Sequence, residues 1–159
     1  MKRGYKVGIV GATGLVGKEL IGLIERTSFP IEILRLYAGF EDAGERIEFL
    51  GDELLVEEMR ADYFKDLDLV FFCAHPLVSK DLAESATQAG VMVIDASPHW
   101  RLNVNALLVV PEVNPEVLEL AKNSPRIISS PSPSVVGLSL ALYPIAKQLG
   151  LKRVIVFGL

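Results

Sequence analysis

Near the N-terminus, glycines are spaced for binding a phosphate group. The run Gly8-Ile-Val-Gly11-Ala-Thr-Gly14-Leu-Val-Gly17 follows a short apolar segment and opens a segment with helical spacing. Glycine lets a backbone turn tightly and approach a pyrophosphate, and the free N–H groups and dipole of a helix start favour an anion. The alternative is a structural turn that binds nothing, because such a motif is weak evidence outside its context. We predict that a dinucleotide contacts Gly8, Gly11, Ala12, Thr13, Gly14, Leu15 and Val16.

Two acidic residues follow the segment that we predict to be the second strand. Glu41 and Asp42 lie where dinucleotide-binding folds place a ribose-binding carboxylate, about 20 residues or somewhat more past the loop. A carboxylate there accepts a hydrogen bond from the ribose 2′-hydroxyl and repels a 2′-phosphate. The two residues therefore favour NAD over NADP if either is bound. The alternative is that both are solvated loop charges.

The composition excludes several classes of function. The net charge is −4 and no run of Lys or Arg is present, so we expect no nucleic-acid partner. No apolar run approaches the roughly 20 residues of a membrane span, and the N-terminal segment does not resemble a signal peptide. The single cysteine, Cys73, excludes an internal disulfide and fits a reducing compartment. We therefore expect a cytoplasmic protein.

Apolar strands alternate with helices along the chain. Because the strands are continuous apolar runs, we predict an α/β fold with a doubly wound, mainly parallel, Rossmann-like sheet and helices on both faces. The predicted strands are residues 5–10, 31–38, 67–74, 91–95, 107–110, 126–129 and 152–157, and a hairpin covers 46–50 and 53–56. The predicted helices are residues 15–26, 80–89, 115–122 and 132–149, with Ser79, Asn114 and Ser132 as N-caps.

Residues 1–159 fit one dinucleotide-binding-type domain. Half of the residues are hydrophobic, and the mean hydropathy is +0.37, which is high for a domain of this size. The chain also stops just after the predicted strand 152–157. We therefore expect part of the surface to be covered, either by a second domain after Leu159 or by self-association.

Four segments in order resemble the aspartate-semialdehyde dehydrogenase family. They are the glycine loop, the run Val93-Ile-Asp-Ala-Ser97 followed by Arg101, the run Leu108-Val-Val-Pro-Glu-Val-Asn114, and residues 127–156. The third run is the most specific, because it is unusual outside the family. The resemblance covers essentially the whole chain, but only about half of a family member, because the substrate-binding and dimerisation domain is not included.

The resemblance implies reduction of β-aspartyl phosphate with NADPH through a cysteine at a helix start, where a thioacyl intermediate forms. In the matching turn, residues 130–134, the cysteine position holds Pro133, which carries no nucleophile. Ser134 would need an adjacent base, and the only histidines of the chain are His75 and His99. We expect Cys73 to be a small core residue. We therefore assign no catalytic residue and expect the chain to be inactive.

Two further departures weaken the family's NADP site. An Arg-Ser-Ala-Gly stretch that recognises the 2′-phosphate is replaced by Glu41-Asp42-Ala43-Gly44, and an Ala-Gly-Gly turn beside the nicotinamide by Ala74-His75-Pro76. By resemblance, Ala74 and Ser97 belong to the cofactor site, and Arg101 holds a substrate or phosphate anion bidentately. The alternative for Arg101 is an exposed arginine on an irregular loop.

Two functions of different classes are open at this point. One is a non-catalytic relative, an NAD(P)-binding-type domain kept for binding or assembly, and Pro133 favours it. The other is the N-terminal part of an active dehydrogenase that reduces an acyl phosphate with NAD(P)H. A related acyl-phosphate reductase family shares the glycine loop, but residues 110–114 favour the aspartate-semialdehyde branch. A downstream domain with an intact catalytic histidine would favour the enzyme.

Overall fold

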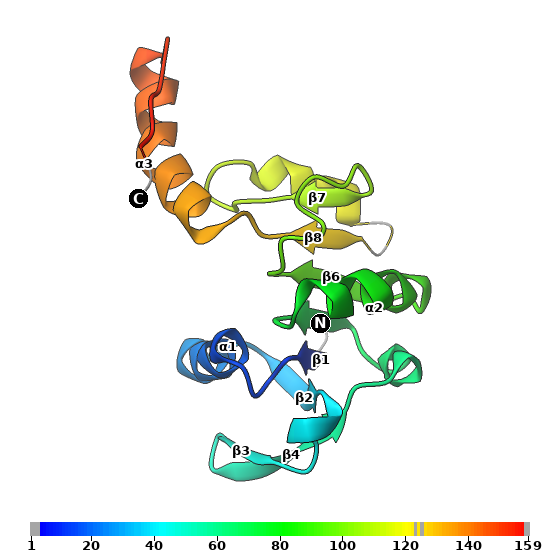
Figure 1. Ribbon diagram of the computed structural model, residues 1–159. Coiled ribbons are helices and arrows are strands. Elements are labelled where there is room, and N and C mark those ends of the chain that lie inside the picture. The colour runs from blue at the N-terminus through cyan, green and yellow to red at the C-terminus, as the bar shows by residue number, and fades with distance from the viewer. Residues whose placement is uncertain (1–3, 123, 125, 158–159) are drawn as a thin grey trace.

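The structure, a computed structural model, describes residues 4–122, 124 and 126–157. Its centre is an eight-stranded sheet in the order β3-β4-β2-β1-β5-β6-β8-β7 (Figure 1). The strands are β1 (Tyr5–Val10), β2 (Ile31–Ala38), β3 (Arg46–Phe49), β4 (Asp52–Glu58), β5 (Leu69–Phe72), β6 (Met92–Asp95), β7 (Ala106–Leu108) and β8 (Ile127–Ser129). The helices are α1 (Leu15–Thr27), α2 (Pro76–Gln88) and α3 (Pro133–Leu149), with short 3₁₀ helices η1 (Phe40–Asp42), η2 (Ala61–Phe64) and η3 (Pro115–Ala121).

The sheet is parallel except at one edge. The antiparallel pair is the predicted hairpin of β3 and β4, whose turn places Leu50 and Gly51 at positive φ. The other neighbouring strands run parallel. The strand order reverses between β1 and β5, which is where open α/β sheets bind ligands. The predicted doubly wound α/β fold is confirmed.

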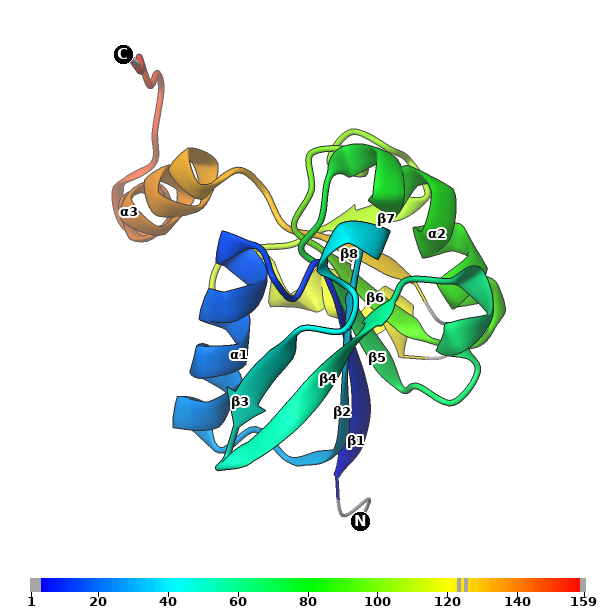
Figure 2. The same ribbon diagram turned by 60° about the horizontal axis from the view of Figure 1, so that its bottom comes forward.

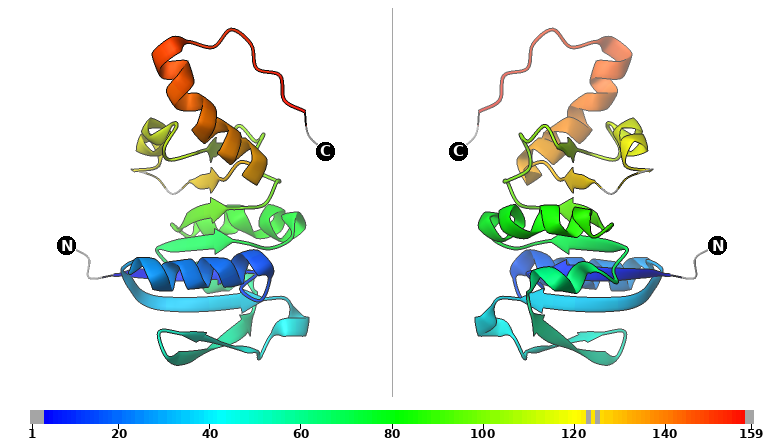
Figure 3. Two further views of the ribbon diagram at one scale, coloured as in Figure 1. Left: turned by 90° about the vertical axis from the view of Figure 1, so that its left-hand side faces the viewer. Right: turned by 90° about the vertical axis from the view of Figure 1, so that its right-hand side faces the viewer.

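Helices cover both faces of the sheet, with α1 on one face and α2 on the other (Figure 3). Successive residues of a strand point to opposite faces. Accordingly, Ile9 of β1 belongs to the same buried cluster as Ile24 of α1, and the next residue, Val10, belongs to the cluster that contains Ala83 of α2. This two-sided burial explains why the strands are continuous apolar runs in the sequence.

The last helix, α3, stands apart from the sheet. It leads away from the end of β8 (Figures 1 and 2), and none of its residues is buried. Residues 152–157 were predicted to be a strand, but they are irregular and exposed, so this prediction was wrong. An apolar run becomes a strand only where a neighbour takes up its backbone hydrogen bonds, and this run pairs with none of the described strands.

Two of the predicted N-caps have other roles. α2 begins earlier than predicted, at Pro76, and the Nδ1 atom of His75 accepts a hydrogen bond from the Leu77 N–H at 3.3 Å. Proline fits this first helical position because its φ is already helical and it lacks an N–H group. Ser79 is instead fully buried inside α2. Asn114 forms no side-chain cap on η3 and bonds to the backbone that precedes it.

Candidate dinucleotide site

The glycine loop joins β1 to α1 at the carboxyl end of β1, as predicted. The N–H groups of Gly11 and Ala12 both donate to the Tyr37 carbonyl, at 2.8 and 3.1 Å, which ties the loop to the end of β2. Gly11 has a φ of 83°, and a Cβ there would lie 2.7 Å from the Cys73 carbonyl oxygen. A Cβ on Gly17 would overlap the Gly11 carbonyl oxygen. Both positions therefore require glycine.

The start of α1 is open. Gly14 is the N-cap and is exposed, and the next side chains, Leu15 and Val16, are 80% and 53% exposed. The helix buries Gly17, Ile21 and Ile24, so its packed side begins only after these first residues. The first N–H groups of a helix have no partner within the helix, so this turn can receive an anion.

Gly8 and Ala12 were also predicted to contact a dinucleotide, and both are buried. A Cβ on Gly8 would lie 2.7 Å from the side chain of Leu67, so the glycine lets β1 pack closely against the core. Ala12 belongs to the buried cluster under α1. Neither residue faces open space, and both support the loop from within the core.

The second predicted feature, the acidic pair, lies on η1. The Thr13 hydroxyl donates a hydrogen bond of 2.7 Å to Oδ2 of Asp42. This bond holds a carboxylate of η1, which follows β2, against the glycine loop. Glu41 is exposed beside it.

A cavity of about 300 Å³ lies between η1 and the first turns of α2. Figure 2 shows these two elements side by side. The ring of Phe40 at its edge is 80% exposed. The cavity is lined by Ala38, Gly39, Phe40, Glu58, Met59, Val78, Asp81 and Leu82. An aromatic ring, apolar walls and a carboxylate suit a flat heterocycle with an amino group.

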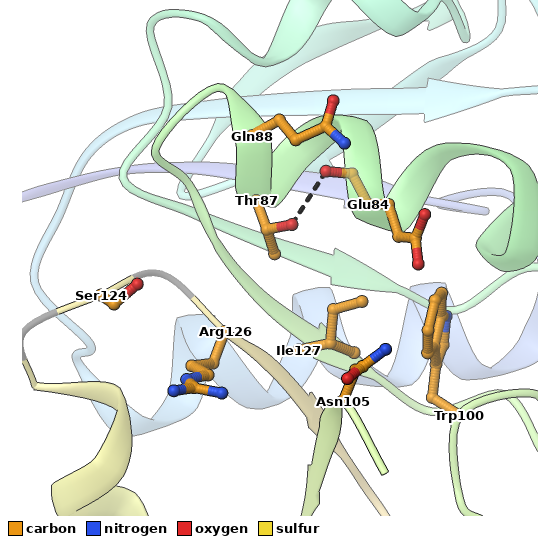
Figure 4. Close-up of a pocket in the computed structure, with 8 residues that line it drawn as sticks. All are labelled: Glu84, Thr87, Gln88, Trp100, Asn105, Ser124, Arg126 and Ile127. Atoms are coloured by element: carbon orange, nitrogen blue, oxygen red, sulfur yellow. Dashed lines mark hydrogen bonds between the residues drawn. The ribbon is translucent and has the colours of Figure 1, made fainter. Parts of the chain in front are cut away.

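A larger cavity, of about 500 Å³, lies elsewhere, between the end of α2 and the start of β8 (Figure 4). Its lining is Glu84, Thr87, Gln88, Trp100, Asn105, Ser124, Arg126 and Ile127. This is the amino edge of the sheet, and none of the lining residues belongs to the glycine loop. Because open parallel sheets bind ligands outside their carboxyl ends, the smaller cavity is the better candidate.

The turn that matches the family's nucleophile turn leads from β8 into α3. Pro133 is the first residue of α3, and Ser132 is its N-cap, without a side-chain capping bond. The only thiol, Cys73, lies just past β5 and is partly buried. Burial, and then the negative charge of Asp95, raise the pKa of the Cys73 thiol to about 11. The thiol is therefore protonated near neutral pH and is a poor nucleophile.

Arg101 reaches back to this turn. Its Nε donates to the Ser130 carbonyl at 3.0 Å, and its Nη2 donates to the Ala96 carbonyl at 3.1 Å. The structure thus places Arg101 at the carboxyl ends of β6 and β8. Ser97 is 4% exposed and donates to a buried carboxylate, and Ala74 lies between Cys73 and the N-cap of α2.

A buried polar cluster escaped the sequence analysis. The Asp95 carboxylate accepts hydrogen bonds from the hydroxyls of Ser79 (2.7 Å) and Ser97 (2.8 Å), and the Ser79 oxygen accepts from the Trp100 indole N–H (3.0 Å). A charged residue at the end of an otherwise apolar strand was the available signal. Such a residue must find partners when it is buried.

Two other classes of site are not found in the described part of the chain. No helix there is long and apolar enough to cross a bilayer. No group of three or more His, Cys, Asp or Glu side chains there could hold a metal ion.

A family model described as "semialdehyde dehydrogenase, NAD binding domain" matches residues 6–121. The chain belongs to this family. Among curated proteins, aspartate-semialdehyde dehydrogenase of Aquifex aeolicus is 40% identical over 154 residues, which are 96% of this chain and 45% of the relative. A USG-1 protein homolog of Azotobacter vinelandii is 39% identical over 145 residues, 91% of this chain and 43% of the relative.

Solved structures agree with this assignment. Aspartate semialdehyde dehydrogenase II of Vibrio cholerae, complexed with ASA, has a TM-score of 0.87 at 33% identity, over 92% of this chain and 48% of that one. The Candida albicans enzyme with NADP has a TM-score of 0.78 at 28% identity, over 93% and 48%. This semialdehyde dehydrogenase domain therefore spans about half the length of the proteins it matches, and the family resemblance is confirmed.

Proposed function

We propose that this domain binds a dinucleotide at the carboxyl end of β1 and does not itself catalyse the covalent reduction. The observation that carries the first half is the glycine loop, which turns tightly through Gly11 into an open helix start where the strand order reverses. Pro133 at the start of α3 supports the second half, because a pyrrolidine ring offers no nucleophile. The site fits a cytoplasmic protein that works on a soluble cofactor.

The proposed pose follows from three features of this edge. The pyrophosphate would lie against the N–H groups of the first turn of α1, at Leu15 and Val16. The adenine would enter the cavity beside η1, with the exposed ring of Phe40 against one face. The carboxylate of Asp81 would accept a hydrogen bond from the exocyclic amine.

The same pose favours NAD over NADP. The Thr13 hydroxyl occupies one lone pair of Asp42 Oδ2, and the remaining carboxylate lone pairs can accept hydrogen bonds from a ribose hydroxyl. A 2′-phosphate at that point would meet the charge of Asp42, with Glu41 next to it. Juxtaposed like charges oppose binding, so we expect NAD to bind about ten-fold more tightly.

Calorimetric titration of the chain with each cofactor tests this proposal. Asp42→Ser should narrow the difference between the two dissociation constants by weakening NAD binding and improving NADP binding. Asp66→Ser is the matched control, because Asp66 is an exposed aspartate on the loop before β5 and should change neither constant. Tighter NADP binding by the unmodified chain would show that the carboxylates point away from the ribose, and binding of neither cofactor would refute the dinucleotide site.

We also propose that α3 packs against a second domain or a second copy of the chain. Five of its large apolar side chains are between 37% and 82% exposed: Val135, Leu138, Leu140, Ile145 and Leu149. An apolar surface of this kind is unfavourable in water and marks a contact site. Light scattering of the 159-residue chain should show association that Leu138→Gln with Leu140→Gln reduces. A clean monomer at high concentration would contradict the self-association.

A further inference from the structure

The buried Asp95 carboxylate is the centre of the cluster described above. It is fully buried, and within the described residues it forms no ion pair. Its two oxygens instead accept the hydroxyl hydrogens of Ser79 and Ser97, one each. A buried charge is costly, and each of these bonds offsets part of that cost only while the donor keeps its position. The carboxylate therefore fixes α2, β6 and the loop after β6 relative to one another.

Trp100 carries this fixed geometry to Arg101. The indole ring is 2% exposed, and its N–H donates to the Ser79 oxygen at 3.0 Å. The ring of His99 meets it edge-on, with centroids 4.9 Å apart. The backbone at Trp100 is thus held by packing of the indole ring and by the hydrogen bond of its N–H. The side chain of the next residue, Arg101, extends from this held backbone.

Arg101 uses one edge of its guanidinium on the backbone. Nε and Nη2, which form the side-on edge, donate to the carbonyls of Ser130 and Ala96. The Ser130 N–H donates in turn to the Asp95 carbonyl at 2.8 Å. Both backbone groups of Ser130 are therefore held from the β6 side. The end-on edge, which includes Nη1, makes no hydrogen bond within the described part of the chain.

We propose that Ser79, Asp95, Ser97, Trp100 and Arg101 form a bracket that positions the turn 130–133 and the start of α3. Arg101 is the positioning residue that touches the turn, and the Asp95 cluster holds Arg101. α3 buries none of its own residues, so its direction depends on its first turn. The bracket fixes that direction through the side-on edge of Arg101.

Hydrogen exchange of the full chain, followed by mass spectrometry, tests the bracket. Arg101→Lys keeps the positive charge, but lysine has one ammonium nitrogen and lacks the planar guanidinium that donates to both carbonyls. We expect exchange in a peptide covering residues 130–136 to rise about ten-fold, because the charge-assisted hydrogen bond to the Ser130 carbonyl is lost. Exchange in the glycine loop should not change. Arg126→Lys is the matched control, because Arg126 is exposed just before β8.

Trp100 supplies a second measurement, because the chain has one tryptophan. Ser79→Ala should shift the indole N–H resonance and also raise exchange at residues 130–136. Trp100→Phe keeps an aromatic side chain but removes the N–H donor, and it should raise the same exchange. If Arg101→Lys does not fold, Trp100→Phe carries the test alone. Unchanged exchange at the turn, or an equal rise along the whole chain, would overturn the bracket, because the first shows no positioning and the second shows only lower global stability.

Discussion

Two helices of this domain begin with nearly the same backbone conformation at the N-cap, but only one of them packs against the sheet. Gly14, the N-cap of α1, has φ −73° and ψ 166°, and Ser132, the N-cap of α3, has φ −64° and ψ 150°. Neither uses a side chain as a cap. Both follow a strand at the same edge of the sheet. Yet α1 packs on its own sheet through Gly17, and α3 buries none of its residues.

The comparison shows that two helix starts can share a backbone conformation and still present different reactive groups. At α1, glycines bring the backbone close to whatever binds there. At α3, Pro133 preserves the helical φ and removes the side chain that a covalent mechanism needs. The first start is supported from inside the domain, and we propose that the bracket supports the second.

The largest effect concerns turnover at the α3 start. The chain should show no reduction of β-aspartyl phosphate and no phosphate-dependent oxidation of the semialdehyde, because loss of a covalent nucleophile costs several orders of magnitude in rate. Pro133→Cys should not restore turnover alone, because the reaction also needs an acid–base group placed against the substrate. The measurement is cofactor absorbance with substrate and enzyme at high concentration. Turnover that survives alkylation of Cys73 would contradict this and implicate Ser134.

The next effect separates the two helices by their glycines. Gly17→Ala should destabilise the domain by about 3 kcal/mol or more, because its Cβ would overlap the Gly11 carbonyl oxygen and backbone cannot yield cheaply. Gly137→Ala in α3 has no atom within 4 Å of the new Cβ and should stabilise the domain by about 0.5–1 kcal/mol. Urea unfolding curves measure both changes. Equal effects would mean that α3 is packed in solution like α1.

The third prediction uses the raised pKa of Cys73. With a pKa of about 11 against an ordinary value of 9.0, alkylation at pH 8 should be about 100-fold slower than that of a free thiol, and should quicken about ten-fold per pH unit up to about 11. Because the folded pKa is the higher one, the folded state holds its proton more tightly. The resulting stability is complete below about pH 9 and is lost as the pH rises through about 11. Fast alkylation at pH 7 would show an activated thiol.

The sequence predicted the features that depend on nearby residues. The alternation of apolar strands and helices, the loop around Gly11 and the hairpin turn at Gly51 are all set within a few positions of the chain, and the structure contains each of them. The approach of Asp42 to the glycine loop followed from the general order of such folds.

The features that failed depend on distant partners. Serine is a residue type that is common at N-caps, yet the Ser79 hydroxyl bonds to Asp95, 16 positions away. The anion role of Arg101 stays a prediction, but local spacing did not indicate that two of its nitrogens donate to backbone carbonyls, one of them 29 positions away at Ser130. Residues 152–157 have strand composition, but a strand exists only beside another strand. Such pairings cannot be seen in local spacing.

The smallest expected effect concerns the cap of α3 itself. Serine at an N-cap is commonly worth about 1 kcal/mol relative to alanine, through a hydrogen bond from its oxygen to an N–H of the first turn. Ser132 forms no such bond, and Pro133 already fixes the first helical φ. Ser132→Ala should therefore cost less than about 0.5 kcal/mol in urea unfolding, below the usual price of a lost cap.

Ser79→Ala supplies the matched comparison, because the same change at Ser79 removes the donor to Asp95 Oδ1 and the acceptor of the Trp100 indole N–H in the core. That variant should cost about 1–3 kcal/mol. If Ser132→Ala cost as much as Ser79→Ala, the Ser132 hydroxyl would be capping α3 in solution. The two helix starts would then differ in their caps as well as in their chemistry, and the comparison between them would have to include the Ser132 hydrogen bond.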